Sequence, residues 1–124
     1  MPDLGPHTRP ALALALLLLS LALVRAADVQ HGQALYQACL ACHTEKPDAL
    51  GPSLKGVFGR KAAERDDFRY SNAMKRANLV WDEANLRAYI QNPQVKIPGN
   101  RMPFGGLSES KDIDDVVAYL KTFK

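Results

Sequence analysis

The sequence predicts an all-α protein in which a few helices are joined by long loops. Apolar residues recur at helical spacing in residues 29–41, 83–91 and 111–123. The segments between them contain proline and glycine too often to be continuous helices. No succession of strand, helix and strand is visible. We therefore expect three main helices, some shorter ones, and long loops.

The beginning of the chain has the pattern of a secretory signal peptide. Residues 11–24 are an apolar run interrupted by one serine, and Arg9 precedes them. Val24 and Ala26 supply small side chains at the two positions that a signal peptidase reads, so we predict that residues 1–27 are removed, with cleavage after Ala26 or Ala27. The run is short for a membrane span, and an uncleaved leader that anchors the protein is the alternative.

The remainder, residues 28–124, forms one domain of nearly balanced charge. The whole chain has a net charge of +3, and the leader contributes two basic residues and one acidic residue, which leaves about +2. Nucleic-acid binding depends on many contacts to phosphates, and this charge argues against it.

The first long helix is predicted over residues 29–41, with Asp28 as its N-cap. Gly32 lies inside this helix, where a glycine costs about 1 kcal/mol relative to alanine. A second helix that crosses closely at Gly32 would explain it, and a tolerated surface glycine is the alternative. His31 lies in the first turn and is expected to be solvated.

Three further helices follow in the second half of the chain. Ser71 can cap a short helix that reaches residue 77, and Asp82 can cap another over residues 83–91, which Asn92-Pro93 ends. Residues 94–107 are expected to be loop. The last helix, over residues 111–123, has acidic residues at its start and lysines at its end, as the helix dipole favours. It is the expected partner of Gly32 and Tyr36.

Both cysteines of the chain lie in one motif, Cys39-Leu40-Ala41-Cys42-His43. This spacing is the attachment signature of a c-type haem, because it places both thiols on one side of a helical turn. Each thiol can form a thioether to a haem vinyl group, and His43 can bind the iron. A redox disulfide and half of a zinc site are the alternatives, but the first expects a βαβ pattern and the second needs more ligands.

Other residues suit the surroundings of such a group. Met102 lies in a loop rich in proline and glycine, which can present a thioether at a fixed point, whereas Met74 lies in a predicted helix and is the poorer candidate ligand. The Pro52 carbonyl can accept the second N–H of an iron-bound imidazole. Trp81, the only tryptophan, can serve as a core anchor and as an N–H donor to a haem carboxylate.

Taken together, these residues resemble a class I cytochrome c of the short mitochondrial and photosynthetic-bacterial type. The similarity covers residues 32–121. It rests on Gly32, Tyr36, the motif at residues 39–43, and residues 51–60, 70–73, 81, 89, 92–93, 97–104 and 118–121.

The resemblance implies a cytochrome c fold around one covalent haem c in residues 28–124. Cys39 and Cys42 would hold the haem, with His43 and Met102 as the axial ligands and Pro52 orienting His43. The remaining implied positions are Arg60, Tyr70 and Trp81 at the haem propionates, Tyr89 near the Met102 sulfur, Asn100 as a further propionate donor, and Phe104 at the exposed haem edge.

Three features depart from the family pattern. Met74 stands where the family usually has a buried asparagine, and Asn100 replaces the usual threonine. The lysine ring around the haem edge is thin, since Ala38, Gln94, Val95, Ser108 and Glu109 stand where lysines are common, while Lys55, Lys96, Arg101 and Lys111 remain. We therefore expect docking on acidic partners to be weaker and less dependent on salt than in the mitochondrial form.

With both axial positions filled, no site remains for a substrate, so we expect a periplasmic one-electron carrier and not an enzyme. The resemblance implies a monomer that contacts membranes only transiently. Its partners would be a cytochrome bc-type complex, a terminal oxidase, a photosynthetic reaction centre or a dehydrogenase. The alternatives are a haem enzyme or gas-binding protein in which Met102 leaves easily, and a dedicated acceptor for one periplasmic dehydrogenase.

Overall fold

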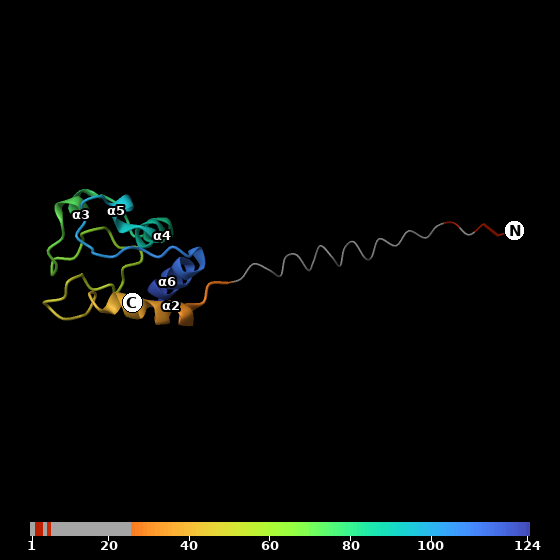
Figure 1. Cartoon of the computed structure of the whole chain (residues 1–124), viewed down its shortest axis with the longest axis horizontal. Coiled ribbons are helices and arrows are strands. Elements are labelled where there is room, and N and C mark those ends of the chain that lie inside the picture. Colours follow the sequence, from red (N-terminus) through yellow and green to blue (C-terminus); the bar gives the residue numbers. More distant parts are fainter. Residues whose placement is uncertain (1, 4, 6–25) are drawn as a thin grey trace.

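The computed structural model describes residues 2, 3, 5 and 26–124 (Figure 1). The expected signal peptide lies almost entirely outside these residues, and it stays a prediction. Within the described part of the chain, no helix is long and apolar enough to cross a membrane.

Five helices connected by loops make up residues 26–124. They are α2 (Val29–Leu40), α3 (Asn72–Arg76), α4 (Glu83–Gln91), α5 (Pro93–Lys96) and α6 (Ser110–Thr122). The only strand-like pairing among the described residues is a single antiparallel bridge between Lys61 and Val80. The prediction of an all-α fold with three main helices, α2, α4 and α6, is confirmed.

Short polar side chains start three of these helices, as predicted. Asp28, Ser71 and Asp82 each have an extended backbone, and the side chain of each accepts a hydrogen bond from the backbone N–H three residues later. Such a cap satisfies one of the N–H groups that a helix start leaves without a partner.

The expectation of a loop from residue 94 was wrong at its beginning. Asn92 ends α4 but also caps α5, because its side chain accepts a hydrogen bond from the backbone N–H of Val95 at 3.2 Å. Pro93 occupies the first turn of α5, where the N–H that proline lacks would have no helical partner. The same dipeptide that stops one helix therefore starts the next.

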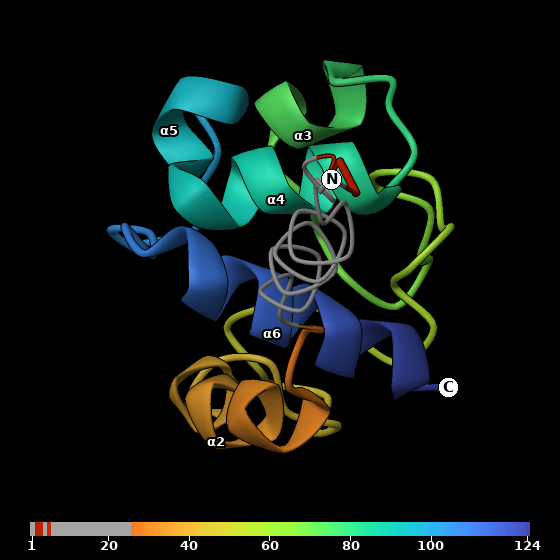
Figure 2. The ribbon, with the colours of Figure 1, turned by 90° about the vertical axis from the view of Figure 1, so that its right-hand side faces the viewer.

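Helices α2 and α6 cross at Gly32, and the predicted close approach is confirmed. A Cβ atom built on Gly32 would lie 1.9 Å from the backbone oxygen of Asp115. Tyr36, one turn further along α2, packs its ring against Tyr119 and Phe123, with centroid distances of 5.1 and 5.6 Å. Figure 2 shows α6 lying between α2 on one side and α4 on the other.

A buried carboxylate stabilises this crossing. Asp115 Oδ1 accepts a hydrogen bond from the backbone N–H of Asp28 at 2.7 Å. Its Oδ2 accepts from Lys111 Nζ at 2.8 Å and also lies 2.7 Å from His31 Nδ1. These contacts, that of Lys111 foremost, hold the pKa of Asp115 far below its usual range. His31 is partly exposed, with 39% of its side chain accessible, and its contact with Asp115 also ties its ring to α6.

The hydrophobic core joins α4 and α6 to the central loops. It consists of Tyr36, Val57, Trp81, Leu86, Tyr89, Ile97, Ile113, Val116, Val117 and Leu120. Cys39, Met74 and Met102 are half-buried and pack against this core. The sulfur atoms singled out in the sequence thus border its apolar interior.

Candidate functional site

The Cys-x-x-Cys-His motif forms the end of α2. The backbone N–H groups of Cys42 and His43 both donate to the Cys39 carbonyl, at 3.1 and 2.9 Å, so the chain continues the helical turn past Leu40. Both cysteines are half-buried and neither forms a disulfide. Burial raises the pKa of the Cys39 thiol. The turn thus places two cysteine side chains and an imidazole within five residues of one another.

The orientation of His43 is set by the loop that follows the motif. His43 Nδ1 lies 2.7 Å from the Pro52 carbonyl oxygen, and because a carbonyl only accepts, Nδ1 carries the proton and Nε2 keeps its lone pair. Only 9% of the side chain is exposed, and this burial lowers its pKa and favours the neutral ring. A Cβ on Gly51 would lie 2.6 Å from the ring, so only glycine allows this approach.

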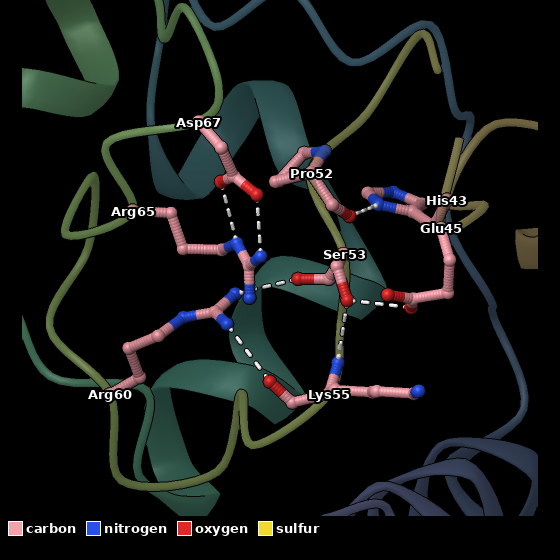
Figure 3. A network of polar contacts seen from close by, with 8 residues as sticks. All are labelled: His43, Glu45, Pro52, Ser53, Lys55, Arg60, Arg65 and Asp67. Carbon is pink, nitrogen blue, oxygen red and sulfur yellow. Dashed lines mark hydrogen bonds and ion pairs between the residues drawn. The ribbon is translucent and has the colours of Figure 1, made fainter. Parts of the chain in front are cut away.

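A polar network holds the loop that supplies the Pro52 carbonyl (Figure 3). Arg60 donates from its two terminal nitrogens to the Ser53 and Lys55 carbonyls, both at 3.0 Å. The Ser53 hydroxyl donates to Glu45 at 2.6 Å and accepts from the Lys55 N–H at 3.3 Å. Ser53 and Glu45 could not be predicted as part of this network, because polar residues in loops give no signal in the sequence before their partners are known.

Tyr70, expected beside Arg60, lies in the same region. Its ring packs edge-on against Phe68 with centroids 5.0 Å apart. Burial raises the pKa of Tyr70, while the nearby Arg60 guanidinium acts in the opposite direction. The Arg65 guanidinium pairs with both carboxylate oxygens of Asp67 at the surface, at 2.8 and 2.6 Å (Figure 3).

The second group of predicted site residues meets around Asn100, whose side chain is 7% exposed. Its Oδ1 accepts from the Met102 backbone N–H at 2.8 Å and from the Tyr89 hydroxyl at 3.2 Å. Its Nδ2 donates to the Pro93 and Ile97 carbonyls, at 2.9 and 2.8 Å. The Asn100 amide therefore connects both ends of α5 to Met102, which carries the thioether.

The expected role of Asn100 as a propionate donor stays a prediction, and the structure shows other partners for its amide. An amide nitrogen has two hydrogens, and here they are directed to the Pro93 and Ile97 carbonyls. The Tyr89 hydroxyl donates its one proton to Asn100, and burial raises the pKa of Tyr89 to about 12.

Trp81 and Phe104 are the remaining residues predicted for the site. Trp81 is 7% exposed and packs against Tyr89 with ring centroids 5.0 Å apart, as expected of a core anchor. Phe104 is half-buried, and its backbone N–H donates to the Met102 carbonyl at 2.9 Å. Phe104 therefore borders the turn that presents the methionine.

These residues fit a covalently attached haem. The two free thiols can form the thioethers, the Nε2 lone pair of His43 is left for iron, and the half-buried Met102 supplies a soft second ligand. In the described part of the chain, no group of three or more His, Cys, Asp or Glu side chains could hold a metal ion by itself. Fold and site together define a c-type haem protein.

Comparison with known proteins identifies the family. The family model described as Cytochrome c matches residues 29–124. Cytochrome c2 of Rhodoblastus acidophilus is 46% identical over 102 residues, which cover 80% of this chain and 95% of that protein. Cytochrome c2 of Agrobacterium tumefaciens (strain II Chrys) is 42% identical over 99 residues, or 75% of this chain and 89% of that protein.

A solved structure gives the same result. The chain is similar to cytochrome cH from Methylobacterium extorquens, with a TM-score of 0.74 and 42% sequence identity over 77% of this chain and 99% of that one. The chain belongs to the cytochrome c family, it carries haem c, and it is an electron carrier.

Proposed function

We propose that this protein shuttles single electrons between redox enzymes in the periplasm and catalyses no reaction of its own. The observation that carries the proposal is the pair of fixed candidate ligands, His43 with its Nε2 lone pair available and Met102 tied to the core through its backbone. With both axial positions taken by the chain, a substrate has no place to bind. The haem, when bound, supplies the Fe(II)/Fe(III) couple.

The chain's own residues would tune this couple. A thioether is a soft ligand that favours the reduced metal and raises the reduction potential. The buried side chains around the site exclude water, which also disfavours the additional charge of the oxidised form. Arg60, Tyr70 and Trp81 are proposed to stabilise the haem propionates. The Arg60 guanidinium acts on the pKa of Tyr70, and the backbone N–H of Trp81 donates to the Arg60 carbonyl at 2.8 Å, so the three residues belong to one region.

The export route is a separate part of the proposal. Residues 1–27 have the signal-peptide pattern, and cleavage after Ala26 or Ala27 would leave Asp28 at or next to the new N-terminus. The mass of the exported protein tests this directly. We expect a chain that starts at Ala27 or Asp28 and carries one haem, whereas a retained leader would overturn the cleavage.

Docking is proposed to depend little on salt, because few cations face the haem edge. Of the cations that remain there, Lys111 is paired with the buried Asp115, and the Arg101 guanidinium donates to the Arg69 carbonyl. Val95, which stands where lysines are common, is 74% exposed. A bc-type complex, a terminal oxidase, a reaction centre and a dehydrogenase are the candidate partners. The dependence of each electron-transfer rate on ionic strength checks the proposal, which a steep dependence would contradict.

The assignment of Met102 is tested by its replacement with alanine. Met102→Ala should keep the haem attached through Cys39 and Cys42 but lower the reduction potential and abolish the weak far-red absorption band of sulfur on ferric iron. Wild-type protein that lacks this band, or that binds carbon monoxide readily when reduced at neutral pH, would instead identify a gas-binding protein or enzyme with a labile Met102.

A further inference from the structure

The segment around Met102 has few regular contacts of its own. It leaves α5 at Lys96, turns through residues 97–106, and returns to the core where the backbone N–H of Leu107 donates to the Ile90 carbonyl at 2.9 Å. Met102 lies near the middle of this span and is only half-buried. Something within the span must therefore fix the thioether, since a loop without such contacts would leave the sulfur mobile.

The Asn100 side chain is the group placed to do this. Its amide makes four hydrogen bonds, two as donor and two as acceptor, all between 2.8 and 3.2 Å. Nδ2 donates to the Pro93 and Ile97 carbonyls at the two ends of α5. Oδ1 accepts from the Tyr89 hydroxyl on α4 and from the Met102 backbone N–H. A further contact, from Gln94 Nε2 to the Asn100 carbonyl at 3.0 Å, fixes the same residue by its main chain.

The geometry assigns Asn100 the role of a positioning residue that holds Met102 at the iron through its backbone rather than through its sulfur. This inference rests on the proposed function, since it takes Met102 as the axial ligand. Removal of the amide would leave the Met102 N–H, the Tyr89 hydroxyl and two carbonyls without this partner in a nearly buried place, so the loop should open more often. Oδ1 accepts from the Met102 N–H, whereas Nδ2 donates to the α5 carbonyls, and an aspartate would retain only the acceptor.

Met74 stands where the family usually has an asparagine, and this difference is consistent with the role of Asn100. Met74 packs against the core as an apolar side chain and offers no amide to Tyr89. The Tyr89 proton goes to Asn100 instead.

Binding of imidazole to the oxidised, haem-loaded protein tests the inference, because an external ligand must wait for Met102 to leave. We expect Asn100→Ala to accelerate imidazole binding by about tenfold or more, equivalent to about 1.4 kcal/mol, and to weaken the far-red band. Asn100→Asp keeps the Oδ1 acceptor but turns a second oxygen, which cannot donate when ionised, toward the Pro93 and Ile97 carbonyls, so it should accelerate binding at least as much as alanine does. Amide hydrogen exchange at Met102 should be slow in the wild type and fast in Asn100→Ala.

Two controls separate positioning from general stability. Asn85→Ala removes a matched amide, whose Nδ2 donates to the Val80 carbonyl at 2.8 Å outside the site, and should leave imidazole binding unchanged. Val116→Ala removes buried apolar contacts of α6, should lower global stability, and should leave the far-red band intact. An unchanged rate of imidazole binding in Asn100→Ala, or an equal acceleration in Val116→Ala, would overturn this inference and leave the proposed function standing. A wild type without the far-red band would overturn the proposed function as well.

Discussion

The crossing of α2 and α6 at Gly32 allows a sharp prediction, because the two outcomes have opposite signs. In a helix that nothing approaches, Gly→Ala stabilises by about 1 kcal/mol. Here the new Cβ would lie 1.9 Å from the Asp115 oxygen, where ordinary contacts measure 3.4–4 Å, so the helices must separate by roughly 1.5 Å. That separation would also weaken the contacts of the Asp115 carboxylate to Asp28 and His31.

We expect a net loss of about 2–4 kcal/mol for Gly32→Ala, from overpacking and weakened hydrogen bonds less the gain in helix propensity. Denaturant unfolding of the haem-loaded protein measures it. Gln33→Ala, at the adjacent exposed position of α2, is the matched control and should change stability by less than about 0.5 kcal/mol. Equal or greater stability of Gly32→Ala would refute the reasoning, since it would mean that the helices do not meet at this residue.

Two more changes probe the polar groups around the core. Asp115→Asn should destabilise by about 2–3 kcal/mol at pH 7. Because the folded pKa of Asp115 is lowered, its contribution to the stability of the wild type is present above about pH 4 and is lost as the pH falls further. The free energy of unfolding, measured against pH, should therefore fall less steeply toward acid pH in the variant. Arg60→Ala should free the Ser53 and Lys55 carbonyls and loosen the Pro52 loop, and faster amide exchange in residues 53–57 would reveal it, while unchanged exchange would exclude this role.

Local features of this protein could be predicted from the sequence with good accuracy. The spacing of Cys39, Cys42 and His43 specifies one turn of helix, and the caps at Asp28, Ser71 and Asp82 bind N–H groups only three residues away. Interactions this short depend on backbone geometry that neighbouring residues impose, so they survive without knowledge of the rest of the chain. The helix crossing at Gly32 was one of two interpretations that the sequence left open, and the 1.9 Å approach of the Asp115 oxygen to a Cβ at this position decides between them.

Tertiary structure decided which polar groups meet. His31 and Asp115 are 84 residues apart, and nothing local marks either as a partner of the other. Asn100 could have donated to a propionate or to the backbone, and only the approach of the Pro93 and Ile97 carbonyls directs its amide inward. A side chain with both donors and acceptors is compatible with many partners, and packing alone selects among them. The motif at residues 39–43 therefore determined that this chain carries a haem, whereas the folded loops around residues 52 and 100 decided how its candidate ligands are held.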